Sequence, residues 1–501
     1  MLFNSIEFLA FFPIVVVLYF ATPHRARWAV LLAASYVFYG WWRVEYLSLI
    51  LLSTVVDYVA GLMMARHESR SGRRPWLLLS LAANLGLLFT FKYLGFFAET
   101  ADAIAGFVGI DGRLNVPALL LPVGISFYTF QTLSYSIDVY RGRQEPERHF
   151  GIFALYVAFW PQLVAGPIER SQHLLPQFRE RHKFVYERAV SGLRLMLWGF
   201  FLKVVLADRL AIAVAEVYNH AGEYSGLPVI FATYLFAFQI YGDFAGYSLI
   251  AIGSARVMGF DLMWNFHTPY FSQSISEFWR RWHISLSTWF RDYLYIPLGG
   301  NRTSRARWLT NIMIVFLVSG LWHGAAWTFV IWGALHGTYL VLGAMTYERR
   351  EKLWNRLAAE SGATEPSVRS AGPALPQMST VKATWRIVCT FHLVLFAWVF
   401  FRASSFAEAT SLISSAFVHS PQPGTGWFGP LSATIGMYNV AVSIFVVGVV
   451  LLVDAATKDG DVDRWLGAHT TASRWAFYLA MLCAFTLLGV YGEAQFIYFQ
   501  F

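Results

Sequence analysis

The amino-acid sequence predicts an all-α polytopic membrane protein that forms one unit over residues 1–501. Of the 501 residues 57% are hydrophobic and only 14% are charged, whereas soluble domains carry about 25% charged residues. Several apolar runs reach the roughly 20 residues that a helix needs to cross a bilayer. No internal similarity at a period of about 20–50 residues is visible, which argues against a transporter built from repeats.

The first five spans are expected near residues 5–22, 27–42, 46–65, 75–97 and 116–137. Two of the loops between them are basic and carry His24, Arg25 and Arg27 in one case and Arg66, Arg70, Arg73 and Arg74 in the other. Both loops fall on the same side of the membrane, and short positively charged loops stay in the cytoplasm. We therefore expect the N-terminus outside.

The apolar segment Phe150–Ile168 lies between two basic stretches, 141–148 and 169–188. Basic loops on both sides conflict with a simple crossing, and Pro161, Gly166 and Pro167 interrupt a helix. A re-entrant hairpin that returns to the cytoplasm satisfies both observations, because irregular backbone is tolerated where protein or water surrounds it. Such a hairpin would open a cavity on the cytoplasmic side.

Further spans are expected near residues 189–207, 226–258, 308–346, 384–401, 432–455 and 473–492. In all, about eleven elements are expected to cross or dip into the membrane. Asp243 lies beside glycines in one of these spans, and an acid there normally faces the protein interior. We expect it to pair with a buried arginine or to cap a broken helix. The polar stretch 348–382 is expected to be a flexible or partly helical loop between spans.

The segment Ser274–Tyr295 is too charged to cross the membrane. At helical spacing its large aromatic residues share one side, namely Phe278, Trp282, Trp289 and Tyr293. Glu277 and Arg281 form an i,i+4 pair in the favourable order. The pattern predicts an amphipathic helix that lies in the membrane interface, with His283 near its aromatic side.

The apolar run Phe316–Gly337 contains two histidines, His323 and His336. Ionisable groups within a span are rare and usually face a cavity, a pathway or a partner. Gly320 and Gly324 flank His323, so the backbone can loosen or approach a ligand closely where the imidazole projects. From these residues alone, a functional His323 and one that merely hydrogen-bonds a neighbouring helix are equally open.

Six stretches carry a more specific signal: PVGISFYTFQTLSYSIDVYRG (122–142), FWPQLVAGPIER (159–170), DFAGYS (243–248), NFHTPYFSQSISEFWRRWHISLSTWFRDYLYIPLGGNR (265–302), SGLWHG (319–324) and FAWVFFRA (396–403). Together they resemble the membrane-bound O-acyltransferase (MBOAT) superfamily, and more closely its bacterial polysaccharide-acetylating branch, which includes the alginate O-acetyltransferases. The resemblance implies an MBOAT-like helical core with a cytoplasmic funnel and an extracytoplasmic opening that meet near the middle of the bilayer. It also implies a bacterial inner-membrane location.

The resemblance implies that His323 in SGLWHG is the essential histidine and that His283 in RRWHISLS is the second polar position. Acyl transfer from a thioester to a hydroxyl needs a base, a donor for the oxyanion and the exclusion of water. A neutral imidazole is a suitable base near pH 7. We expect His323 to activate the acceptor hydroxyl, and His283 to orient it or to donate to the thioester carbonyl. Trp322 would exclude water, and His336 is expected to be a structural or lining histidine.

The expected donor is acetyl-CoA, which enters from the cytoplasm, and no bound cofactor or metal is expected. Its phosphates need cations, for which the arginines near the interface are suitable, although each one alone more often anchors a chain to lipid headgroups. The expected donor-binding residues are Arg280, Arg281, Arg291 and Arg302, with Trp322.

The acetyl group is expected to pass outward to an exported polysaccharide such as alginate. The expected partner is a periplasmic or membrane-anchored acetyl-accepting transferase of a polysaccharide secretion complex, and the surrounding lipids are a further partner. Although the net charge is +8, the positive residues lie in short loops and no basic face with interleaved aromatics is present. Nucleic acid is therefore not expected as a partner.

Three other functions stay open. Transfer of D-alanine from a carrier protein into a teichoic-acid pathway would require a docking site for the carrier, and a histidine at the position of His283 is common to both kinds of transferase. A transporter or channel would use the intramembrane histidine, aspartate and arginine as a relay. A membrane anchor for a secretion complex would need no chemistry at all.

Overall fold

The computed structural model describes residues 1–110, 112–117, 119–164, 166–360, 380–418, 428–492 and 496–497. Every regular element in these ranges is a helix and none is a strand, which confirms the all-α prediction. Among the described residues, seven helical stretches are long and apolar enough to cross a membrane: Val44–Ala65, Arg70–Phe107, Leu227–Met258, Trp327–Tyr347, Thr380–Arg402, Met437–Thr457 and Thr471–Leu488. The chain is a multi-pass membrane protein, and the count of about eleven elements stays a prediction.

The N-terminal third begins with three helices, α1 (Ile6–Ala21), α2 (Arg27–Gly40) and α3 (Leu47–Ala65), joined by the 3-10 turns η1 (His24–Ala26) and η2 (Val44–Tyr46). A long helical run follows: α4 (Arg70–Leu88), the π-helical turn η3 (Phe89–Tyr93) and α5 (Leu94–Phe107). These elements agree with the first four predicted spans, although α5 continues ten residues beyond the predicted end at residue 97.

The fifth predicted span, 116–137, was placed too early in the chain. Helix α6 covers Ile125–Tyr140, and the residues that lead up to it are irregular. Its N-cap, Gly124, has φ +77°, a conformation that favours glycine. A Cβ on Gly124 would also lie 2.7 Å from the carbonyl oxygen of Leu163, so this turn packs directly on the chain of the predicted hairpin.

The apolar segment that begins at Phe150 is broken, as predicted. It forms α7 (Phe150–Ala158) and α8 (Trp160–Leu163), followed by α9 (Ser171–Gln177). The break falls at Phe159 instead of Pro161, because proline fits the first turn of α8. The two helices together are too short for a membrane span, since about 14 residues rise only about 21 Å. The re-entrant path itself stays a prediction.

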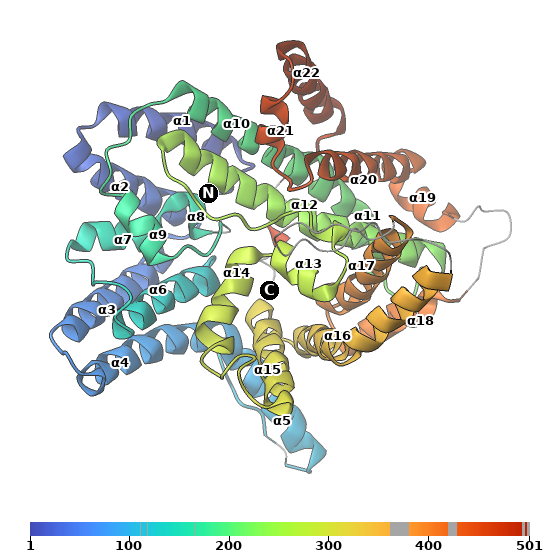
Figure 1. The fold of residues 1–501 in the computed structure, drawn as a ribbon, viewed down its shortest axis with the longest axis horizontal. Coiled ribbons are helices and arrows are strands. Elements are labelled where there is room, and N and C mark those ends of the chain that lie inside the picture. The colour runs from blue at the N-terminus through green and yellow to red at the C-terminus, as the bar shows by residue number, and fades with distance from the viewer. Residues whose placement is uncertain are drawn as a thin grey trace.

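Helix α12 (Leu227–Met258) forms the centre of the molecule and is buried along almost its whole length (Figure 1). Beside it lie α10 (Tyr186–Phe200), the π-helical turn η4 (Phe201–Ala207) and α11 (Asp208–Asn219), of which α11 was not predicted. Helices α10 and α12 approach closely because both carry glycine at the contact. A Cβ on Gly199 would lie 2.7 Å from the carbonyl oxygen of Gly246, and the reverse distance is also 2.7 Å.

The single amphipathic helix predicted for Ser274–Tyr295 is wrong. The 3-10 turn η5 (Pro269–Phe271) is followed by α13 (Ile275–Arg281), α14 (Ile284–Phe290) and the π-helical turn η6 (Arg291–Tyr295). The helix is interrupted because residues 265–267 lie alongside the break and bond to its backbone. His267 N–H donates to the Arg281 carbonyl at 3.0 Å, and Ile284 N–H donates to the Asn265 carbonyl at 3.0 Å.

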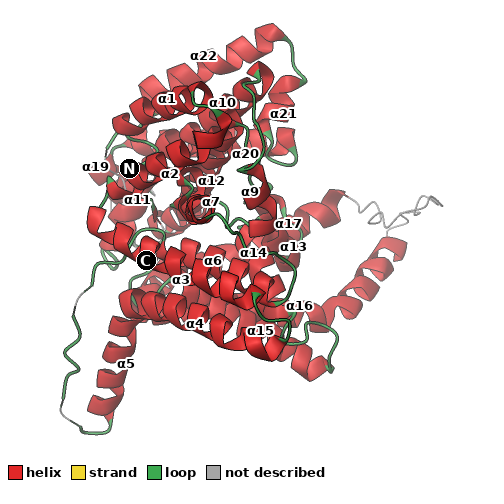
Figure 2. Ribbon diagram, turned by 90° about the vertical axis from the view of Figure 1, so that its left-hand side faces the viewer, coloured by secondary structure: helices red, strands yellow, loops and turns green. Residues whose placement is uncertain are grey.

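The C-terminal half contains α15 (Arg305–His323), α16 (Trp327–Glu360), α17 (Thr380–Arg402), α18 (Phe406–Ala416), α19 (Gly429–Ile435), α20 (Met437–Thr457), α21 (Val462–Gly467) and α22 (Thr471–Leu488). The polar stretch 348–382 is helical at both ends, and its residues 361–379 lie outside the described residues. Figure 2 shows α5 and the ends of α16 and α17 that flank this stretch on opposite sides of the bundle.

Candidate functional site

His323 is the last residue of α15, at the point where the chain reverses into α16. The two helices pack closely because Gly320 and Gly333 lie at their contact, where a Cβ on either would overlap a backbone carbonyl of the other helix. The sequence predicted that the backbone at Gly320 and Gly324 could approach a ligand closely. In the structure Gly320 instead packs against the backbone of α16, and Gly324 packs against the Phe329 ring. The His323 side chain is only 2% exposed.

The structure brings together three of the predicted site residues, His283, His323 and Trp322. The imidazole centroids of His283 and His323 are 6.3 Å apart, and the Trp322 ring lies 5.9 Å from the first and 5.0 Å from the second. His283 sits at the break between α13 and α14 with φ +43°, and it is fully buried. The break that the sequence pattern did not predict therefore places His283 beside His323.

His336 lies one layer away from this pair. The Trp332 ring separates the two histidines, at 4.9 Å from the His323 ring and 4.9 Å from the His336 ring. The indole N–H of Trp279 donates to Nδ1 of His336 at 3.3 Å. These packing contacts agree with the structural role expected for His336.

The contacts described for the predicted arginines are with residues other than His283 and His323. Arg281 pairs with Glu277 at 2.7 Å, which confirms the predicted i,i+4 contact, and Arg280 donates to Ser276 at 3.1 Å. Arg291 bonds its neighbour Asp292 at 2.8 Å, and Arg302 is exposed in the turn after η6. Arg281 also donates to Thr268 at 3.4 Å, and the other contacts are local. The role of these arginines in binding a donor stays a prediction.

Lys92 is a residue of this site that the sequence reasoning missed. It lies in the π-helical turn η3, and its Nζ donates to the backbone carbonyls of Trp322 at 2.7 Å and His323 at 3.0 Å. The available signal was a lysine inside the predicted span 75–97, because an ionisable group in a span is expected to have a partner or a function.

A small pocket lies beside His323. Its wall combines η3, the irregular chain before α6 and the end of α15; the lining residues are Lys92, Leu121, Pro122, Val123, Gly124, Ile125, Ser126, Phe127, Val164, Trp322 and His323. In the part of the chain that the structure describes, no three His, Cys, Asp or Glu residues cluster as metal ligands. The polar and aromatic groups that line the pocket are the imidazole of His323, the ammonium of Lys92 and the rings of Phe127 and Trp322.

A second small pocket lies between α10, α12 and the chain at residues 264–266. The Phe266 ring lines it and packs 5.0 Å from the Phe244 ring, which in turn packs 4.6 Å from the His283 imidazole. Two aromatic rings thus lie between this pocket and the histidine pair.

Asp243 is buried and paired as expected, but its partner is a lysine and not an arginine. Nζ of Lys203 lies 2.7 Å from Asp243 and 2.8 Å from Asp208, so one ammonium joins two carboxylates. The second oxygen of Asp243 accepts the backbone N–H of Ile497 at 2.6 Å. The ion triad therefore ties α12 to η4, α11 and the C-terminal segment.

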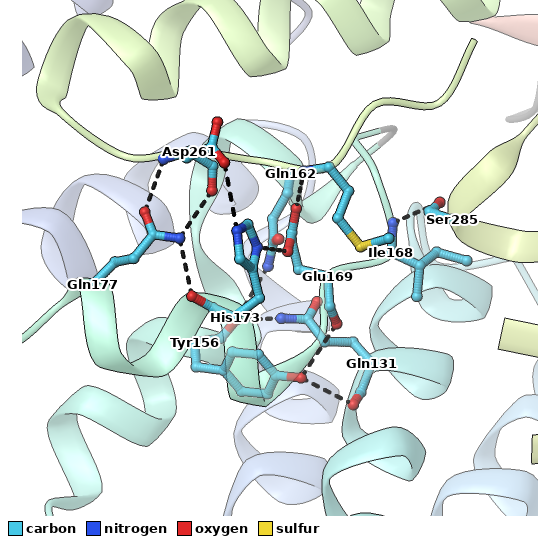
Figure 3. A network of polar contacts seen from close by, with 10 residues as sticks. Gln131, Tyr156, Gln162, Ile168, Glu169, His173, Gln177, Asp261 and Ser285 are labelled. Atoms are coloured by element: carbon cyan, nitrogen blue, oxygen red, sulfur yellow. Dashed lines mark hydrogen bonds and ion pairs between the residues drawn. The ribbon is translucent and has the colours of Figure 1, made fainter. Parts of the chain in front are cut away.

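A polar network joins the chain at residues 168–173 to the helix that begins after His283 (Figure 3). The fully buried Glu169 carboxylate contacts Nδ1 of His173 at 2.8 Å, and the other ring nitrogen lies 3.5 Å from Asp261. Hydrogen bonds to Asp261 and then Glu169 raise the pKa of His173 to about 10. Ile168 N–H donates to Ser285 Oγ at 3.0 Å, so the network reaches the first turn of α14.

Comparison with known proteins gives a consistent result. The model of the membrane-bound O-acyltransferase family matches residues 143–357, a range that contains His283 and His323. A probable alginate O-acetylase of Azotobacter vinelandii is 40% identical over 420 residues, which cover 83% of this chain and 78% of that protein.

Two further relatives are named for a polymer other than alginate, and one of them for transfer of a D-alanyl group instead of an acetyl group. A peptidoglycan O-acetyltransferase of Helicobacter pylori is 34% identical over 447 residues, covering 82% of this chain and 79% of that protein. A teichoic acid D-alanyltransferase of Streptococcus thermophilus is 30% identical over 316 residues, covering 59% of this chain and 71% of that protein.

Proposed function

The chain belongs to the membrane-bound O-acyltransferase family and is an O-acyltransferase, and from this we propose that it acetylates an exported polysaccharide, with acetyl groups taken from cytoplasmic acetyl-CoA. The observation that carries the proposal is the pair of buried histidines, with ring centroids 6.3 Å apart, at a pocket that His323 lines. A base and a second imidazole beside a cavity fit acyl transfer to a hydroxyl.

In the proposed reaction, His323 takes the proton of the acceptor hydroxyl as its oxygen attacks the thioester carbonyl. The tetrahedral intermediate then collapses with release of the CoA thiolate, which the imidazolium of His323 protonates. His283 orients the reacting groups or donates to the oxyanion. The indole N–H of Trp322 is buried and has no acceptor within the described ranges, so it is a further donor for the oxyanion.

The two pockets support opposite routes for acceptor and donor. With the N-terminus outside, the chain at residues 121–127, which lines the pocket beside His323, follows α5 on the extracytoplasmic side. The chain at residues 264–266 and Gly460, which line the second pocket, then belong to cytoplasmic loops. We assign the first pocket to the acceptor and the second to the approach of the donor, with Arg280, Arg281 and Arg302 as ligands for the CoA phosphates.

Acetyl transfer is favoured over D-alanyl transfer by the extent of similarity. The relatives named as O-acetylases match 82–83% of this chain, whereas the D-alanyltransferase matches 59%. The polysaccharide in the proposal is alginate or a similar polymer, and a periplasmic or membrane-anchored transferase completes the transfer. The location in the proposal is the bacterial inner membrane, where cytoplasmic acetyl-CoA and an exported polymer are both within reach.

The donor assignment is tested with the purified protein in nanodiscs. Radiolabelled acetyl-CoA and D-alanine bound to a carrier protein are supplied separately, each with alginate oligosaccharides as acceptor and with the candidate partner transferase present. We expect release of CoA and label in an alkali-labile ester only with acetyl-CoA. Turnover of the D-alanyl carrier without turnover of acetyl-CoA would contradict the proposal and favour the alternative acyl group.

A further inference from the structure

The end of α15 is held by a separate helical run. A helix leaves its last four carbonyls without partners inside the helix, and in α15 these belong to residues 320–323. Gly324 N–H donates to the Gly320 carbonyl at 3.3 Å. Tyr93 OH donates to the Leu321 carbonyl at 3.0 Å, and Lys92 Nζ donates to the carbonyls of Trp322 and His323. Two adjacent residues of η3 thus satisfy three of the four carbonyls.

The Lys92 ammonium is directed at protein acceptors. Besides the two carbonyls, at 2.7 and 3.0 Å, its Nζ lies 3.4 Å from the hydroxyl of Ser126. Three acceptors match the three hydrogens of an ammonium group. The C-terminal end of a helix also carries partial negative charge, which favours a cation there. These contacts explain how a lysine is tolerated inside an apolar helical run, and they indicate positioning in preference to direct contact with a substrate.

The local backbone supports the same conclusion. The run α4–η3–α5 is helical over Arg70–Phe107 and departs from α-helical geometry only in the five residues Phe89–Tyr93. π-helical turns of this kind are frequently found at functional sites. Here the turn coincides with the two residues that reach α15, and the same turn lines the pocket beside His323.

We propose that Lys92 is a positioning residue that fixes the last turn of α15, and with it the His323 imidazole and the Trp322 indole, against the acceptor pocket. The inference rests on the proposed role of His323 as the base. A base displaced by about 1 Å loses on the order of a hundredfold in rate. Binding of the acyl donor depends on other residues, so the effect belongs to kcat and not to KM.

The test compares variants of the full chain in nanodiscs with acetyl-CoA and an acceptor glycan. Lys92→Met is expected to lower kcat by about a hundredfold, with KM for acetyl-CoA within about twofold of the wild type. Lys92→Arg retains a cation with several donors and is expected to restore most of kcat. Tyr93→Phe removes the bond to Leu321, two residues before His323, and is expected to lower kcat less than tenfold. The thermal midpoint of each variant is measured in parallel.

Three results would overturn the inference. The first is a kcat of Lys92→Met equal to that of the wild type. The second is an equal fall in kcat and in thermal midpoint for Lys92→Met and Tyr93→Phe, which would assign Lys92 a general stabilising role. The third is the absence of CoA release from the folded wild type, which would refute the proposed function as well. If Lys92→Met does not fold, Lys92→Gln takes its place, because its amide keeps donors for a carbonyl. The same comparison of kcat, KM and thermal midpoint then applies to Lys92→Gln.

Discussion

Lys203 illustrates what a charged residue requires when it is buried among helices. Its side chain is 1% exposed and lies within 2.8 Å of Asp208 and within 2.7 Å of Asp243. Buried charges are costly unless they are paired and hydrogen-bonded. The ammonium holds together two elements that would otherwise repel each other through their carboxylates.

Removing this ammonium is expected to destabilise the protein strongly. Lys203→Met leaves two buried carboxylates without their cation, which costs about 3–5 kcal/mol for a broken buried pair. Thermal unfolding of the purified protein in detergent measures the loss. Arg194→Met serves as the control, since Arg194 pairs with Asp463 at 3.1 Å where both side chains retain 14–18% exposure. A loss for Lys203→Met no larger than for Arg194→Met would contradict the account.

The individual residues show how far sequence reasoning reaches. A histidine in an apolar run singled out His323, and the family motifs added His283 and Trp322. The same argument from charge at membrane depth, applied to the spans 75–97 and 189–207, would have identified Lys92 and Lys203. The sequence could not predict that Lys203 is the partner of Asp243, because this pairing depends on how the helices pack against one another.

At the scale of elements, the break between α13 and α14 was not predictable from periodicity. The sequence between Arg281 and Ile284 contains neither proline nor glycine. The helix breaks because residues 265–267 compete for its backbone groups, and this contact is set by tertiary packing. The proline and glycine residues of the hairpin, in contrast, correctly predicted an interruption in the segment that begins at Phe150.

The network around His173 joins several elements and predicts a pH dependence. The pKa of His173 is raised to about 10 by Asp261 and Glu169, above its ordinary value of about 6.5. Its stabilising contribution is therefore complete below about pH 6.5 and is lost as the pH rises through about 10. The difference in free energy of unfolding between the wild type and His173→Gln is expected to be largest at pH 6 and to shrink toward pH 10. Denaturant unfolding at several pH values measures it, and a difference independent of pH would refute this assignment.

At the scale of the whole molecule, the basic loops predict which faces of the bundle meet the cytoplasm. Figure 2 shows α5 and the ends of α16 and α17 on opposite sides, in agreement with an extracytoplasmic end of α5 and cytoplasmic ends of α16 and α17. Composition was sufficient to predict a helical membrane protein. It did not predict the two pockets, because a cavity depends on how side chains from distant segments fill the space between helices.

Cysteine labelling in intact cells tests the orientation. In a chain with Cys389 and Cys483 replaced by serine, Glu45→Cys in η2 is expected to react with a membrane-impermeant maleimide from outside. Arg25→Cys in η1 is expected to react only after permeabilisation, because positively charged loops stay in the cytoplasm. The opposite pattern would invert the assignment of donor and acceptor pockets.

The most direct test of the central claim compares two buried histidines that differ in their expected role. CoA release from acetyl-CoA is measured in nanodiscs for the wild type, His323→Asn and His336→Asn, with thermal unfolding as a check on folding. Loss of the general base is expected to reduce turnover about 10²–10⁴-fold in His323→Asn, while His336→Asn stays within about tenfold of the wild type. Full turnover by a folded His323→Asn protein would show that His323 is not the base and would contradict the account.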